Sequence, residues 1–145
     1  MAAPILLTVE RHFAAAPGTL FDAWLDPESV GQWLFATPDG VMETVEIDPR
    51  VGGKFLIVER RGDELAEHFG EYLEIDRPRR LVFTFAAVRD EGFTTVTVII
   101  EPAEGGSRLT LNHEMDARWA DYADRTLQGW TTILEGLARR LATDA

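Results

Sequence analysis

The chain has 145 residues, no cysteine, and 25 acidic against 14 basic residues, which gives a formal net charge of −11 at pH 7. This length suits a single domain that buries roughly 70% of its unfolded surface, and the absence of cysteine excludes disulfides and thiolate metal sites. An acidic surface repels phosphate backbones, so we expect no nucleic-acid binding.

The N-terminal segment lacks the features of a signal peptide, because its short apolar run follows no basic region and ends at Thr8. No apolar stretch approaches the roughly 20 residues that a membrane span needs. We therefore expect a cytoplasmic location and no membrane insertion, in agreement with the lack of cysteine.

A first strand and two short helices are predicted at the N-terminal end. Residues 5–13 are apolar and β-branched enough for a strand. Pro17 suits the first turn of a helix, and Asp26 is a typical N-cap for a second helix that runs towards Trp33. The apolar stripe of the first helix consists of Leu20, Phe21, Trp24 and Leu25.

The middle of the chain indicates a series of strands joined by short turns. The predicted strands cover residues 41–47, 54–59, 65–75, 81–85 and 94–101, followed by a strand with Leu109, Leu111 and His113 on one face. Consecutive strands with short connections form an antiparallel meander. The facing of residues 65–75 stays open, because a bulge near Gly70 would change which side chains point inward.

The C-terminal segment shows the clearest helical pattern. Its apolar residues recur every three or four positions, as a long amphipathic helix requires. They are Trp119, Tyr122, Ala123, Thr126, Leu127, Trp130, Ile133, Leu134, Leu137 and Leu141. We predict one α+β domain over residues 1–145, in which a curved antiparallel sheet of six or seven strands wraps around this helix.

Four stretches of this sequence resemble a known family. They are Phe13–Pro17 with Trp24 and Trp33, Asp48–Phe55, Gly70–Ile75 with Leu81–Thr84, and Gly129-Trp130 with Leu134 and Leu137. In this order they resemble the START-like, or helix-grip, superfamily and, within it, the C-terminal domain of the activator of Hsp90 ATPase. The resemblance implies the helix-grip fold and an internal cavity. It does not imply one activity, since relatives include co-chaperone domains, lipid carriers and cyclases.

Aromatic and polar residues on the predicted inner surface are candidates for contacts with a ligand. Apolar pockets combine aromatic walls with a few polar groups that orient the guest, although the same aromatic residues also build ordinary cores. The candidates are Trp33, Phe35, Phe55, His68, Phe69, Tyr72, Phe83, Phe85, Val98, Leu111, His113, Tyr122, Thr126, Gly129 and Trp130.

Gly129 and Gly136 lie on nearly the same side of the predicted C-terminal helix. A glycine inside a helix costs about 1 kcal/mol relative to alanine, so two of them need a reason. Close approach of the helix to the sheet is one explanation, and space left for a ligand is another.

Neither a metal site nor a catalytic triad is indicated. The three histidines lie on different predicted strands without metal-type spacing, and the two serines lie outside any nucleophile motif. We expect no cofactor. Glu59, Glu67 and Glu71 are the carboxylates that would act as an acid or base if one were buried among aromatic rings.

These patterns favour a non-catalytic protein that binds a small hydrophobic or aromatic molecule between sheet and helix. Two alternatives stay open. One is an enzyme of the cyclase, hydrolase or isomerase type that uses the same cavity. The other is a co-chaperone-like module that binds a protein partner. As partners, a second protein and a second copy of the chain in a homodimer both stay open.

Overall fold

The computed structural model describes residues 5–34, 40–86, 94–115 and 117–143. In chain order the elements are β1 (Ile5–Phe13), α1 (Pro17–Asp22), α2 (Pro27–Trp33), β2 (Val41–Ile47), β3 (Lys54–Arg61), β4 (Glu64–Asp76), β5 (Arg80–Phe85), β6 (Thr94–Ala103), β7 (Gly106–Met115), the 3-10 helix η2 (Ala117–Tyr122) and α3 (Ala123–Thr143). None of the described helices is long and apolar enough to cross a membrane. The predicted element order is confirmed.

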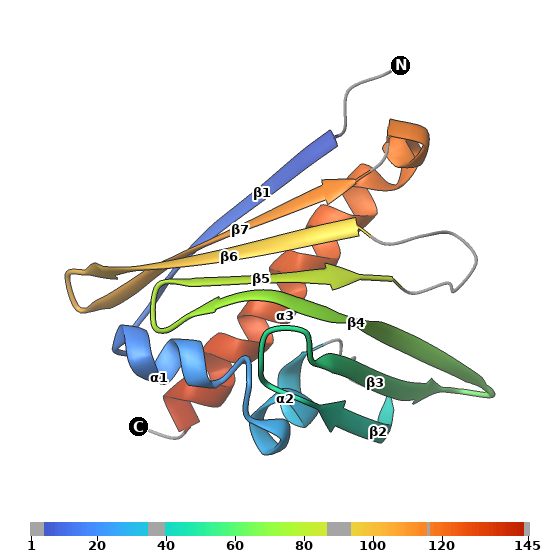
Figure 1. Cartoon of the computed structure of the whole chain (residues 1–145), viewed down its shortest axis with the longest axis horizontal. Coiled ribbons are helices and arrows are strands. Elements are labelled where there is room, and N and C mark those ends of the chain that lie inside the picture. Colours follow the sequence, from blue (N-terminus) through green and yellow to red (C-terminus); the bar gives the residue numbers. More distant parts are fainter. Residues whose placement is uncertain (1–4, 35–39, 87–93, 116, 144–145) are drawn as a thin grey trace.

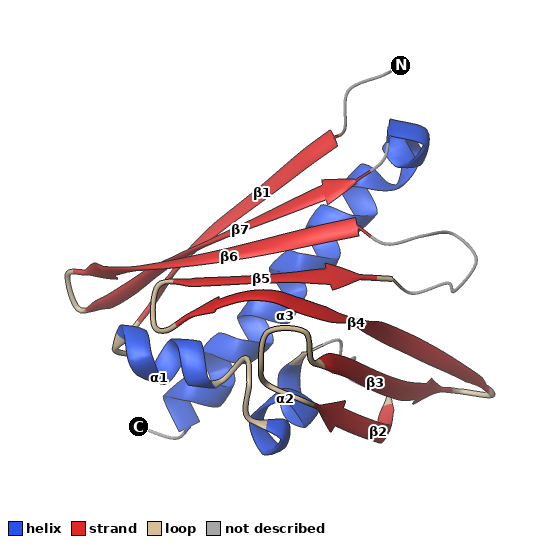
Figure 2. Ribbon diagram, viewed as in Figure 1, coloured by secondary structure: helices blue, strands red, loops and turns tan. Residues whose placement is uncertain are grey.

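The strands form one curved antiparallel sheet of seven strands in the order β1-β7-β6-β5-β4-β3-β2. Each strand from β2 to β7 pairs with its neighbours in sequence, while β1 pairs with β7 at the far edge. The long helix α3 crosses behind the sheet (Figures 1 and 2). The helix α2 packs against the C-terminal half of α3, where Trp33 lies near Gly136, and α1 packs against β6 and β7. This is the predicted helix-grip fold.

The helices differ from the prediction at two ends. The helix α1 stops at Asp22, because the chain turns before Asp26, the N-cap of α2, and Pro27. The C-terminal helix begins as the 3-10 helix η2 and becomes α-helical at Ala123, a common arrangement at helix N-termini. Tyr122 therefore lies before α3 and not within it.

The core lies between α3 and the face of the sheet that we call the inner face. Alternate residues of the central strands point into it, among them Phe83, Val98 and Leu111. From the opposite layer, Leu134 and Leu137 of α3 are fully buried. Each such side chain contributes roughly 1.5–3 kcal/mol when it leaves water, so this seam holds the two layers together.

The structure resolves the facing of β4. Ile57 pairs with His68 and Phe55 with Gly70, so His68, Gly70 and Tyr72 all point inward. The register shift in the pairing of β4 with β5 lies beyond them, between Tyr72 and Glu74. A bulge therefore exists, but it leaves these three residues on one face.

Gly70 lies where β4 passes close to β5 and to Phe55. A Cβ atom at this position would overlap the carbonyl oxygen of Thr84 and would lie 2.8 Å from Cε2 of Phe55. The obstacle is backbone on one side and a packed ring on the other, so neither gives way easily. Glycine is therefore required here for steric reasons.

We expect Gly70→Ala to lower the free energy of unfolding by about 3 kcal/mol, because the added methyl group forces the two strands apart. Urea unfolding followed by circular dichroism measures the change. A loss below about 0.5 kcal/mol would contradict the close approach of β4 to β5.

Candidate functional site

A chain of hydrogen bonds joins α3 to the inner face of the sheet. Trp130 donates its indole N–H to Nδ1 of His113 at 2.9 Å. On the other side of the ring, Nε2 of His113 lies 2.7 Å from the Thr94 hydroxyl, which donates to the Phe85 carbonyl at 3.1 Å. An indole N–H only donates, so Nδ1 accepts and the proton of the neutral imidazole lies on Nε2. Both ring nitrogens of His113 are thus engaged.

His68 completes a group of rings around Phe85. Its Nδ1 lies 3.3 Å from the Ile57 carbonyl oxygen, and its ring stacks on Phe85 with centroids 6.0 Å apart. The Phe85 ring also lies 5.8 Å from His113 and 6.5 Å from Trp130, in edge-to-face contact with each. These four side chains from β4, β5, β7 and α3 form what we call the histidine cluster.

Both histidines of the cluster are uncharged at neutral pH. Burial lowers the pKa of His113 from 6.5 to about 4. Burial, followed by the charge of Arg61, lowers the pKa of His68 to about 4 as well. The cluster therefore presents aromatic and neutral polar surface, which suits an uncharged ligand.

A side chain added at Gly129 would meet no other atom of the described residues. A Cβ built there has no neighbour within 4 Å among the described residues, whereas at Gly136 the Cβ of Trp33 lies at 4.0 Å. Close approach to the sheet is thus not the reason for Gly129. The space next to Trp130, on the flank of α3, is open.

Towards α1 and β5 the interior is filled by aromatic rings. Trp24 lies 4.8 Å from Trp33 and 6.4 Å from Trp130, measured between ring centroids. The cavity that remains has a volume of about 10 Å³. It is lined by Trp24, Leu34, Phe55, Tyr72, Leu81 and Phe83. This volume is close to the space that one water molecule occupies.

Most residues predicted to contact a ligand are buried on the inner side. They are Trp33, Phe55, His68, Tyr72, Phe83, Val98, Leu111, His113 and Trp130. Phe85, Thr126 and Gly129 are partly exposed. Phe35 lies outside the described residues.

Two candidates do not face the interior. Tyr122 is 47% exposed, with the Arg125 guanidinium over its ring, because it belongs to η2 and not to the inward stripe of α3. Phe69 lies on the outer face, since adjacent residues of a strand alternate and His68 points inward. Sequence reasoning also missed Thr94 and Trp24. Thr94 could have been found, because it lies two residues before Val96 and so shares the inward face of β6.

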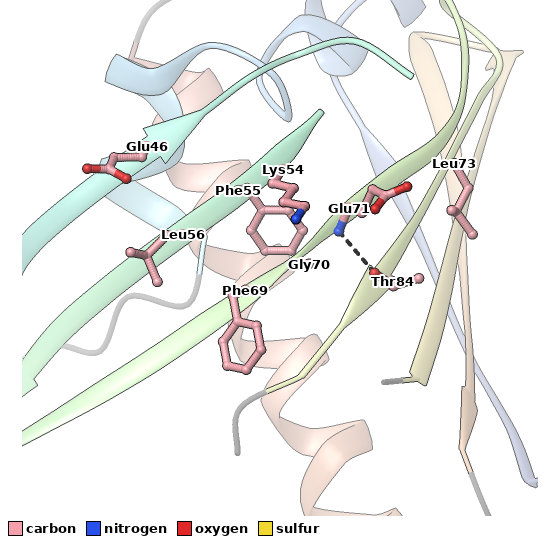
Figure 3. Close-up of a pocket in the computed structure, with 9 residues that line it drawn as sticks. All are labelled: Glu46, Lys54, Phe55, Leu56, Phe69, Gly70, Glu71, Leu73 and Thr84. Atoms are coloured by element: carbon pink, nitrogen blue, oxygen red, sulfur yellow. Dashed lines mark hydrogen bonds between the residues drawn. The ribbon is translucent and has the colours of Figure 1, made fainter. Parts of the chain in front are cut away.

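Phe69 instead lines a groove of about 610 Å³ on the outer face of the sheet (Figure 3). Its floor includes the cross-strand pair Leu56 and Phe69, and Lys54 opposes Glu71 beside it. The Thr84 hydroxyl accepts a hydrogen bond from the Glu71 backbone N–H at 2.9 Å. This groove is separated from the histidine cluster by the sheet itself.

The three carboxylates singled out in the sequence have different environments. Glu59 is 1% exposed and forms an ion pair with Arg61 at 2.5 Å, so it does not stand among aromatic rings as a lone acid. Glu67 and Glu71 are partly exposed on the outer face. Within the described residues, no group of three potential metal ligands gathers.

Acidification should destabilise the fold through the two buried histidines. The unfolded chain takes up these protons near pH 6.5 and the folded protein only near pH 4, so falling pH favours unfolding across this window. We expect each histidine to cost about 2 kcal/mol between pH 7 and pH 5. Urea unfolding at both pH values measures the loss, which His113→Gln should reduce. The exposed His12→Gln variant is the control, and an equal effect of both variants would contradict this assignment.

Gly129→Ala should raise the free energy of unfolding by about 1 kcal/mol, because alanine favours the helix and its methyl group enters open space. Thermal and urea unfolding of ligand-free protein measure the gain. A loss of stability would show that this flank of α3 is filled.

Solved structures share this fold. A protein of unknown function from Staphylococcus aureus superposes with a TM-score of 0.88 at 16% identity, covering 97% of this chain and 95% of that one. A protein from Rhodobacter sphaeroides superposes with a TM-score of 0.83 at 27% identity, covering 95% of this chain and 92% of that one. An AHSA1-like protein from Aeromonas hydrophila superposes with a TM-score of 0.83 at 22% identity, covering 97% of this chain and 94% of that one.

No curated protein matches the sequence at a significant level. A family model does match, namely that of the activator of Hsp90 ATPase homolog 1-like proteins, over residues 14–142. The matched region includes both short helices, the strands β2 to β7 and nearly all of α3. The chain therefore belongs to the family of activator of Hsp90 ATPase homolog 1-like proteins.

Proposed function

We propose that the protein binds a small hydrophobic or aromatic molecule between the sheet and α3, beside the histidine cluster. The observation that carries this proposal is the open space at Gly129. A helix interior gains about 1 kcal/mol from alanine in place of glycine, so the unfilled position is a cost to stability that ligand binding explains.

The chemistry around this space supports an uncharged aromatic guest. Trp130 is adjacent to Gly129 in the chain, and its ring contacts Phe85 and His113. Aromatic rings favour other rings in stacked or edge-to-face geometry. Because both histidines are neutral, no unpaired charge on these rings opposes the burial of an apolar surface.

Binding fits the geometry of His113 better than catalysis does. A general acid or base must release or accept a proton at an atom that reaches the substrate. In His113 the Nδ1 atom accepts from Trp130, and the Nε2 atom contacts Thr94. Its imidazole therefore holds the helix to the sheet, which is a structural task.

The test uses N-phenyl-1-naphthylamine, a neutral aromatic probe whose fluorescence rises in apolar surroundings. We expect wild-type protein to bind it and Gly129→Phe to weaken binding by at least about tenfold, because the new ring fills the space. Phe69→Ala changes the outer groove alone and should leave the affinity unchanged. Circular dichroism verifies that both variants are folded.

The two variants separate the inner site from the outer groove. Unchanged affinity in folded Gly129→Phe, together with loss of binding in Phe69→Ala, would place the probe in the groove and contradict the proposal. Absence of binding to the wild-type protein would also contradict it.

A further inference from the structure

The indole of Trp24 is a buried hydrogen-bond donor that lacks an acceptor. The residue is 1% exposed, and its Nε1 atom has no hydrogen-bond partner among the described residues. Its neighbours are satisfied, since Trp33 donates to the Ala23 carbonyl at 3.2 Å and Trp130 donates to His113. A buried donor without a partner costs roughly 1–3 kcal/mol, so native proteins rarely leave one.

Trp24 lines the cavity of about 10 Å³ inside the aromatic core. Four of the other five lining side chains are hydrocarbon, from Leu34, Phe55, Leu81 and Phe83. The cavity has room for roughly one oxygen-sized group. Apart from the phenol oxygen of Tyr72, its lining side chains offer nothing that accepts a hydrogen bond.

Tyr72 contributes a second donor to this lining. Burial, followed by the charge of Asp48, raises the pKa of its phenol above the ordinary value. The phenol therefore keeps its proton at physiological pH. Apart from this phenol oxygen, the side chains that line the cavity are a donor-bearing indole and hydrocarbon groups, and the Trp24 donor has no acceptor among the described residues.

The missing acceptor belongs to an uncharged group. No lysine, arginine or charged histidine lines the cavity, and an anion buried there would have no counter-charge. A carbonyl oxygen accepts hydrogen bonds, carries no net charge and needs little room. A hydrocarbon group of the same size would leave the Trp24 donor unpaired.

We propose that the ligand is a neutral aromatic carbonyl compound whose oxygen accepts the Nε1–H of Trp24. This inference rests on the proposed function, since it names the ligand class of the same site. The two parts of that site are neighbours, because the ring of Trp24 lies 6.4 Å from the ring of Trp130, the residue next to the open flank of Gly129. The aromatic part of the ligand lies beside Trp130, and its oxygen points towards Trp24.

The test compares 2-acetylnaphthalene with 2-isopropenylnaphthalene, in which a CH₂ group replaces the carbonyl oxygen. Calorimetric titration of wild-type protein should give an affinity about tenfold higher for the ketone. In Trp24→Phe, which keeps an aromatic ring but lacks the N–H, the two compounds should bind equally well. Phe69→Ala on the outer face should keep the preference for the ketone.

A second measurement uses wild-type protein alone, in case Trp24→Phe fails to fold. The chain has four tryptophans, so ¹⁵N-labelled protein gives four indole N–H signals. Contacts to the rings of Trp33 and Phe83 identify the signal of Trp24. The ketone should shift this proton signal downfield and slow its exchange with water, and the hydrocarbon should do neither.

The outcomes separate the two proposals. Equal affinity of both compounds for wild-type protein, with the same effect on the Trp24 signal, would overturn the carbonyl site while leaving ligand binding intact. Binding of neither compound would overturn both. A Trp24 signal already slow to exchange in the free protein and unchanged by the ketone would show that a trapped water supplies the acceptor, which also overturns the carbonyl site.

Discussion

The hydrogen-bond chain from Trp130 through His113 to Thr94 determines how α3 sits on the sheet. At Trp130 the helix is held by a directional hydrogen bond to His113 and not by apolar packing alone. The seam of Leu134 and Leu137 closes the layers further along α3. Because the helix is held at Trp130 and again along the leucine seam, the flank at Gly129 can stay unfilled without letting the layers collapse. The candidate site therefore depends on a buried imidazole that stays neutral.

Much of the fold follows from patterns that act locally. Alternation along residues 94–101 and the N-cap at Asp26 identify elements whose side chains have one favourable arrangement. The site is less predictable, because it depends on which strand faces meet. His68 and Phe69 cannot both face inward, because adjacent residues of a strand alternate, and only the pairing of β3 with β4 decides between them. The partner of Trp130 is similarly set by a contact between distant segments.

The family relation supports the fold more strongly than the activity. Related structures keep the same architecture at identities of 16% to 27%, which leaves room for different linings of the same interior. In this chain the inner surface combines neutral histidines, closely packed rings and one unsatisfied indole donor. The outer groove, with Lys54 and Glu71 beside Leu56, has a different chemical character.

Intermolecular nuclear Overhauser effects between bound N-phenyl-1-naphthylamine and the protein test the position of the site most directly. We expect contacts from the probe protons to the rings of Phe85 and Trp130 and to the α protons of Gly129. Contacts to Leu56 and Leu73 in their place would locate the ligand in the outer groove and contradict a site between the sheet and α3.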